Sequence, residues 1–136
     1  MNAKEYLSQA YRLDIQINNK LAIMDSLHSL ATNATTTYGL VPPSGTRKVD
    51  MLGDTLAKIV DMDIEINKEI DRLVDLKKEI LETINKVENC DERVLLELRY
   101  LCFKTWEEIA VKLGYNVRHL YRIHRDALDH VSEICH

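Results

Sequence analysis

The stretch TWEEIAVKLGYNVRHLYRIHRDAL, residues 105–128, decides the fold of the C-terminal part of this chain. Thr105 and Glu108 form a capping box, in which a threonine side chain starts a helix and a glutamate follows three residues later. Gly114 suits the left-handed residue that ends this helix, and Asn116 can cap the next helix. A helix, a short turn that contains glycine and a second helix together predict a helix-turn-helix.

Each predicted helix of this region has one apolar face. In the helix that starts after Thr105, this face holds Trp106, Ile109, Ala110 and Leu113. In the next helix, expected from Val117 to about His130, it holds Val117, Leu120, Ile123, Ala127 and Leu128. A preceding short helix, with Asp91 as its expected N-cap, presents Val94, Leu95, Leu98 and Leu101. Ala110 is small, which suits a place where two helices cross closely. The three apolar faces together predict that residues 90–136 form a compact helical bundle.

The last of these helices has a local basic face. From Lys112 to Arg125 there are four Lys or Arg and no Asp or Glu, although the whole chain has a net charge of −4. The outward face is expected to hold Arg118, His119, Tyr121, Arg122, His124 and Arg125. A recognition helix places such side chains against base edges and phosphates. The predicted DNA-binding residues are Lys112, Asn116, Arg118, His119, Tyr121, Arg122 and Arg125. The alternative interpretation is a solvated face of an ordinary three-helix bundle.

Residues 1–89 have the pattern of two long amphipathic helices. The first is expected from about Ala3 to Ala31, with a seam of Tyr6, Ala10, Leu13, Ile17, Met24, Leu27 and Ala31. The gap in this seam at Lys20 can be filled by neighbouring Leu21. The second helix is expected from about Asp50 to Asn89, with a seam of Leu52, Leu56, Ile59, Asp63, Ile66, Ile70, Leu73, Lys77, Ile80, Ile84 and Val87. Steps of three and four residues predict a coiled coil.

A loop is expected between the two long helices, over residues 32–48, because this segment contains Pro42-Pro43 and two glycines. Arg47 and Lys48 could touch a phosphate there, although a solvated loop is the more ordinary interpretation. Residues 1–89 are thus predicted to form an antiparallel coiled-coil helical hairpin for oligomerisation or partner binding. Its longer second helix leaves a surface for the C-terminal bundle or for a second copy of the chain.

Composition agrees with an all-α protein, because the chain has only four glycines and two prolines. Cys90, Cys102 and Cys135 form no CxxC pair, so they are expected to be reduced thiols, with Cys102 packed rather than nucleophilic. His119 and His124 are spaced badly for a shared metal. Neither a phosphate-binding glycine loop nor a nucleophile elbow is recognisable. We therefore predict no enzyme activity, no metal, no cofactor and no small-molecule substrate. Lacking a long apolar run, the chain is expected to be cytoplasmic without membrane contact.

Residues 91–129 resemble the region-four helix-turn-helix of sigma factors, and the whole pattern is similar to RinA/ArpU-like phage and prophage regulators of Gram-positive bacteria. The resemblance implies a transcriptional activator of late phage genes for packaging and structural proteins, which contacts host RNA polymerase. By motif position, Arg118, His119, Arg122 and Arg125 would face DNA, joined by Tyr121. Asn116 departs from the Ser or Thr common at this cap but keeps its role. Sigma region two is missing, so the implied protein recruits polymerase and does not melt promoters.

Three functions are open at this point. The leading one is a homodimeric regulator that binds double-stranded DNA, since two-fold proteins read repeated half-sites. A small terminase subunit, which marks phage DNA for packaging, also combines a helix-turn-helix with long helices, but it assembles into large rings. A coiled-coil adaptor that binds only proteins would lack the salt-dependent DNA affinity that phosphate contacts produce.

Overall fold

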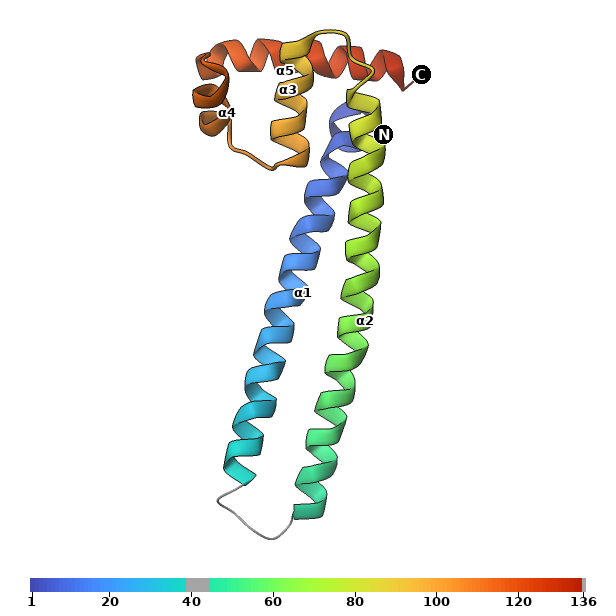
Figure 1. Ribbon diagram of the computed structural model, residues 1–136, viewed down its shortest axis with the longest axis vertical. Coiled ribbons are helices and arrows are strands. Elements are labelled where there is room, and N and C mark those ends of the chain that lie inside the picture. Colours follow the sequence, from blue (N-terminus) through green and yellow to red (C-terminus); the bar gives the residue numbers. More distant parts are fainter. Residues whose placement is uncertain (39–44, 136) are drawn as a thin grey trace. The chain divides into compact units, whose positions relative to one another are not determined.

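The computed structural model describes residues 1–38 and 45–135, and the side chains of all of these except residues 33–38 and 45–52. In these ranges the chain contains helices and no strand, which confirms the all-α prediction. The elements are α1 (Ala3–Tyr38), α2 (Gly45–Ile84), α3 (Cys90–Leu96), the π-helical segment η1 (Glu97–Leu101), α4 (Trp106–Leu113) and α5 (Val117–Ile134) (Figure 1).

The long helices differ from their predicted bounds. α1 continues past Ala31 to Tyr38, and α2 begins at Gly45 and ends at Ile84 instead of Asn89. The loop predicted over residues 32–48 is therefore too long, because Thr and Asn lower helix propensity only mildly and do not by themselves end a helix. Pro42-Pro43 lies outside the described residues, as do the side chains of Arg47 and Lys48, so the phosphate contact considered for that pair stays untested.

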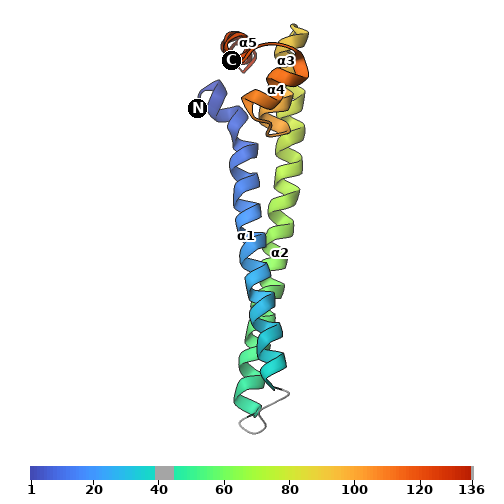
Figure 2. The ribbon, with the colours of Figure 1, turned by 90° about the vertical axis from the view of Figure 1, so that its left-hand side faces the viewer.

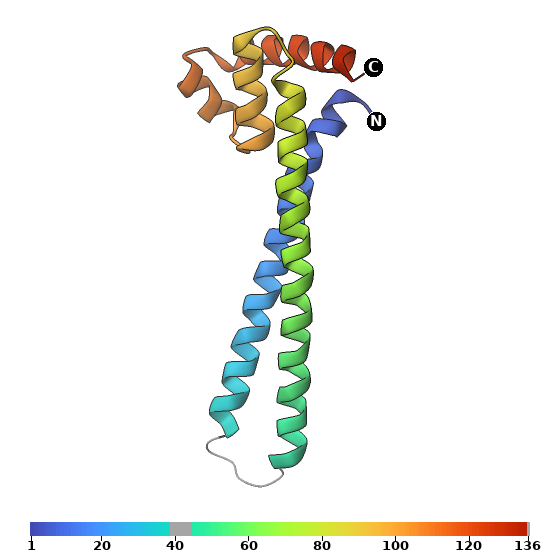
Figure 3. The same ribbon diagram turned by 45° about the vertical axis from the view of Figure 1, so that its right-hand side comes forward.

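The chain divides into two compact units. Unit 1 consists of residues 1–14 and 72–136, and unit 2 consists of residues 15–71. Within unit 2, α1 and α2 run side by side in opposite directions (Figures 2 and 3). The domain boundary predicted near residue 89 rests on a change in sequence composition, whereas the two units are defined by contacts between residues. The two divisions therefore describe different things, and the predicted boundary stays a prediction.

The α1 seam predicted in unit 2 is confirmed by burial. Ile17 and Ala31 are buried, and Met24 and Leu27 are half-buried. The expected substitution of Leu21 for Lys20 is wrong, because Leu21 is 40% exposed and Lys20 itself occupies the seam. A cation is tolerated there because its ammonium pairs with two carboxylates of α2, at 3.0 Å to Glu65 Oε1 and more closely with Glu69.

Seven of the ten predicted α2 seam positions with described side chains are correct, and the side chain of Leu52 lies outside the described residues. Ile59, Ile66, Ile80, Ile84 and Val87 are buried, and Leu73 and Lys77 are half-buried, as expected. The positions predicted between them in unit 2 are wrong, because Leu56, Asp63 and Ile70 are exposed. The half-buried positions are instead one residue earlier, at Thr55, Met62 and Glu69. Both choices give steps of three and four, so the periodicity does not distinguish them; the partner helix does.

Unit 1 has one apolar core to which all its helices contribute. Its fully buried members include Leu7 and Ala10 of α1, Ile80 and Ile84 of α2, and Leu95, Leu96, Ile109, Leu120, Ala127 and Val131 of α3, α4 and α5. Val87 is also buried although α2 has ended before it. Helices α3 and α4 are too short to be stable alone, so their stability depends on this shared core.

The predicted cap of α3 is wrong by two residues. Asn89, in an extended conformation, is the N-cap, and its Oδ1 accepts the backbone N–H of Glu92 at 3.1 Å. Asp91 lies in the first turn instead, where its carboxylate accepts a hydrogen bond from the hydroxyl of Tyr115 at 2.8 Å. Asn and Asp cap helices about equally well, so residue type alone did not separate the two positions.

A buried carboxylate joins α3 to α5. Glu92 is 4% exposed, and its Oε2 lies 2.7 Å from Nδ1 of His130. The hydrogen bond from His130 to Glu92 raises the pKa of His130 above 6.5, and the charges of Glu92, Glu133 and Asp126 act in the same direction. The protonated histidine is therefore the form that this contact favours.

The Glu92–His130 pair predicts a loss of stability as the pH rises above 6.5. Because the folded pKa of His130 is raised, its contribution is complete below pH 6.5 and disappears as the pH rises through the folded value. The urea midpoint of the wild type, followed by circular dichroism, should fall over this window. His130→Gln should have a flatter profile, whereas His119→Gln, on the exposed face of α5, should keep the wild-type slope. Parallel profiles of the wild type and His130→Gln would contradict this assignment.

Candidate nucleic-acid interface

The start of α4 confirms the helix start and the Thr105 cap that the sequence predicts. Thr105 is extended, and its Oγ1 accepts the backbone N–H of Glu108 at 3.2 Å. The same hydroxyl donates to the carboxylate of Glu108, also at 3.2 Å. These contacts satisfy one of the free N–H groups of the first turn, which is why the helix begins at Trp106.

The turn between α4 and α5 also follows its sequence signals. Gly114 has φ 75°, in the left-handed region, and its N–H donates to the carbonyl of Ala110 at 2.9 Å. Asn116 is extended and caps α5, with its Oδ1 accepting the N–H of His119 at 2.8 Å. α5 extends past the predicted end at His130 to Ile134, because buried Val131 continues its apolar stripe.

The inward faces of both helices agree with prediction. Ile109, Leu120 and Ala127 are fully buried. The other expected members are half-buried, and all of them except Val117 pack against the same core: Trp106, Ala110, Leu113, Val117, Ile123 and Leu128. The opposite surfaces of α4 and α5 are therefore the ones available to a partner.

All seven predicted DNA-binding residues are exposed. They lie at the end of α4, at the cap and along the first half of α5: Lys112, Asn116, Arg118, His119, Tyr121, Arg122 and Arg125. Acidic residues enter α5 only from Asp126 onward, so the first half of the helix carries the positive charge. The ring of Tyr121 also packs edge-on against Trp106, with centroids 5.2 Å apart, which limits its freedom.

His119 is held beside the turn. Its ring meets the ring of Tyr115 edge-on at 4.7 Å between centroids, and the hydroxyl of Tyr115 donates to Asp91. This chain of contacts links the start of α5 to the first turn of α3. The sequence shows Tyr115 directly after Gly114, but it does not indicate that Tyr115 contacts Asp91 of α3 and His119 of α5.

His124 does not belong to the outward face, which corrects the prediction for this residue. Its ring is half-buried, stacks near Tyr100 and lies edge-on to Trp106 at 4.9 Å between centroids. Burial, followed by the charges of Lys4 and Arg99, lowers the pKa of His124 to about 4. Burial raises the pKa of Tyr100 to about 12, and its Oη lies within hydrogen-bonding distance of His124 Nε2, at 2.5 Å.

The Tyr100–His124 pair predicts a loss of stability in acid, which is separate from the loss that His130 produces as the pH rises. The folded pKa of His124 is depressed, so its contribution is present above pH 6.5 and is lost as the pH falls towards 4. Solvent screens the partly exposed ring, so we expect a loss of about 2 kcal/mol. His124→Gln should remove this component when urea unfolding is compared at pH 7 and pH 4.5. An identical difference in both proteins would refute the assignment.

The connection from α3 to α4 was not foreseen. Residues 97–101 form a π-helical segment, and Phe103 then adopts φ 57°, which is unusual for a bulky residue. Hydrogen bonds from Cys102 N to Glu97 O (3.0 Å) and from Lys104 N to Leu98 O (2.9 Å) hold this reversal. Cys102 is exposed, so the expected packing role is wrong, whereas Phe103 packs on Tyr11 at 5.4 Å between ring centroids.

The described part of the chain contains no group of three or more His, Cys, Asp or Glu placed to hold a metal ion. None of its helices is both long and apolar enough to cross a membrane. Cys90, Cys102 and Cys135 are free and exposed thiols.

Comparison with known proteins identifies the chain at the level of its family. No curated protein and no solved structure matches it significantly. The family described as "Protein of unknown function (DUF1492)", which is associated with phages, matches residues 40–132. That match covers α2, α3, α4 and most of α5, which is more than half of the chain. The protein is therefore a member of the DUF1492 family.

Proposed function

We propose that this protein binds specific DNA sequences and regulates transcription of phage or prophage genes. The observation that carries the proposal is the exposed positive charge on the first half of α5, directly after a capped turn from α4. Arg118, Arg122 and Arg125 lie there at steps of four and three residues, on a helix whose opposite face is buried. This is the arrangement by which a recognition helix enters the major groove.

The roles of the individual side chains follow from their chemistry. Arg118 and Arg122 are placed to contact guanine edges in a bidentate manner, because both are exposed and one turn apart. Lys112 and His119, beside the turn, suit the phosphates that flank such a site. In this proposal α4 and α5 form a helix-turn-helix of the sigma region-four type, and α1 and α2 form a coiled-coil hairpin.

Unit 2 supports a homodimer as the working form. Its two helices expose large apolar side chains away from their shared seam: Ile15, Leu21, Ile23, Leu30, Leu56, Val60, Ile64 and Ile70. Such side chains gain free energy when a partner removes them from water. A second copy would also present a second recognition helix for a repeated half-site.

The proposed regulator is a cytoplasmic activator of late phage genes in a bacterial host, which recruits RNA polymerase to DNA. The test is selection of fragments of the phage or prophage genome by the purified protein at physiological salt, read by sequencing. One enriched site upstream of a late operon, with affinity that falls steeply as salt rises, is the expected result. Enrichment of a packaging site by a ring-shaped assembly would replace it with the terminase function, and absence of enrichment would refute DNA recognition.

A further inference from the structure

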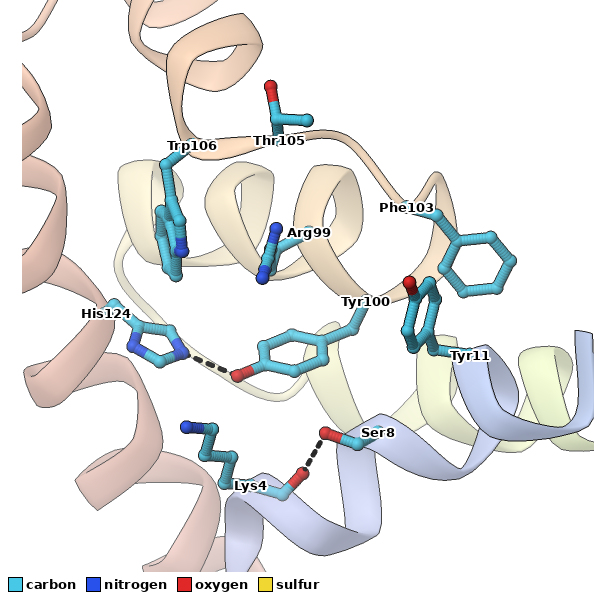
Figure 4. A pocket seen from close by; sticks show the side chains of 9 residues that line it. All are labelled: Lys4, Ser8, Tyr11, Arg99, Tyr100, Phe103, Thr105, Trp106 and His124. Atoms are coloured by element: carbon cyan, nitrogen blue, oxygen red, sulfur yellow. Dashed lines mark hydrogen bonds between the residues drawn. The ribbon is translucent and has the colours of Figure 1, made fainter. Parts of the chain in front are cut away.

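Unit 1 contains an open cavity of about 250 Å³ that does not involve the proposed DNA-binding residues. Side chains of α1, η1, α4 and α5 and of the turn before α4 line it (Figure 4). The volume approaches that of pockets that hold small organic ligands. Because so many elements meet here, a molecule bound in the cavity would contact most of unit 1 at once.

The charge of the cavity is positive. Lys4 and Arg99 both line it, and none of the described residues that line it is acidic, although the chain as a whole has a net charge of −4. Arg99 uses one nitrogen, Nη1, to donate to the carbonyl of Lys104 at 3.0 Å, which leaves its other N–H groups for a ligand. The depressed pKa of His124 has Lys4 and Arg99 among its causes, in agreement with a positive potential at this point.

The walls of the cavity are aromatic. Tyr11 and Phe103 close one end with their rings edge to face, and Trp106 stands at the other end, with Tyr100 between them (Figure 4). The guanidinium of Arg99 lies 4.8 Å from the centre of the Trp106 ring, so a cation and an apolar surface are adjacent. Rings in this arrangement offer faces and edges to a flat, apolar group.

We propose that the cavity binds a small aromatic carboxylate. Its carboxylate is held by Lys4 and Arg99, and its ring is held among Tyr11, Phe103 and Trp106. The concave shape and the aromatic walls favour such a molecule over a nucleic-acid phosphate, which would use the charges and leave the rings unoccupied. Since Lys4 belongs to α1 and Trp106 to α4, the ligand fastens the end of α1 to the C-terminal helices and so acts as an effector of unit 1.

The protein provides its own reporter for the test, because Trp106 is the single tryptophan of the chain. The full-length protein is titrated without DNA, with benzoate, with benzyl alcohol as the neutral aromatic analogue and with acetate as the anion without a ring. Benzoate should change the fluorescence saturably, with a Kd of about 1 mM for a ligand of this size. Benzyl alcohol and acetate should bind at least tenfold more weakly.

Variants separate a built site from a general charge effect. Lys4→Met keeps most of the side-chain length and should weaken benzoate binding at least tenfold, whereas Lys58→Met, an exposed lysine of unit 2, should leave it unchanged. If Lys4→Met lowers the helical circular dichroism signal, Tyr11→Leu supplies the test and should weaken binding to a similar extent. The titrations with benzoate, benzyl alcohol and acetate contain no DNA, so failure of the proposed function would not affect their result.

Four outcomes would overturn the proposal. The first is the absence of a saturable response to benzoate, and the second is an affinity for benzyl alcohol or acetate equal to that for benzoate. The third is unchanged benzoate affinity in Lys4→Met or, if that variant does not fold, in Tyr11→Leu. The fourth is displacement of benzoate by an equimolar amount of duplex DNA. The last of these would assign the cavity to a nucleic-acid phosphate.

Discussion

Replacing Arg118 and Arg122 together by alanine should abolish sequence-specific DNA binding and leave the fold intact. Both side chains are exposed on α5, and neither belongs to the core of unit 1, so their removal does not disturb packing. A bidentate arginine–guanine contact contributes about 1–3 kcal/mol of discrimination against the wrong base. The double variant should therefore lose at least about 30-fold in affinity for the selected site, and more where both contacts are strong.

The measurement is fluorescence anisotropy with the selected site and with a scrambled duplex at the same salt concentration. A matched control is Arg12→Ala with Arg72→Ala, which removes the same charge from exposed positions of α1 and α2. This control should lose little affinity, because only the sequence-independent part of binding depends on distant charge. Equal affinity of the wild type and the Arg118/Arg122 variant for the selected site would refute the assignment of α5 as the recognition helix.

Ala110→Glu should unfold or misdock α4. Ala110 is half-buried against the core of unit 1, and its carbonyl accepts the N–H groups of Gly114 and Tyr115, at 2.9 and 3.2 Å. A glutamate there adds volume to a packed face, and its carboxylate loses contact with water without gaining a partner of opposite charge. We expect a destabilisation of about 3 kcal/mol or more, together with loss of DNA binding.

Val111→Glu is the matched control, because it places the same side chain on the next residue of α4, which is 85% exposed. Its thermal midpoint should stay close to that of the wild type, since exposed substitutions rarely change stability by more than about 0.5 kcal/mol. Circular dichroism melting of both variants gives the comparison. An Ala110→Glu protein that is soluble, folded and fully competent to bind DNA would contradict the close packing of α4 at this residue.

Some features were predictable because their causes lie within a few residues of each other. Thr105 with Glu108, Gly114 and Asn116 act through hydrogen bonds that span three or four residues, and each was located correctly. Such contacts depend on local backbone geometry and on side-chain type, both of which are readable along the chain. Asn89 shows the limit, because two equivalent capping residues, Asn89 and Asp91, lay within one turn of each other.

Other features depend on partners distant in the sequence. His124 was expected to be solvated, but Tyr100 and Trp106 bury it, and its pKa follows from that burial. The cavity beside it joins Lys4 to Arg99, residues far apart in the sequence that no spacing rule relates. The exposed arginines of α5 were located from the sequence, and their contact with DNA stays a prediction that the variants above test.

By itself, the sequence determined the helical class, the caps and turn of α4 and α5, the inward face of each and the position of the basic residues. Only the tertiary structure decided which positions of the α2 seam are buried, why Lys20 is tolerated within the α1 seam and that His124 is withdrawn from the surface. The physical reason is the same in each case. Periodicity and capping act along one helix, whereas burial and pairing depend on which other helix packs against it.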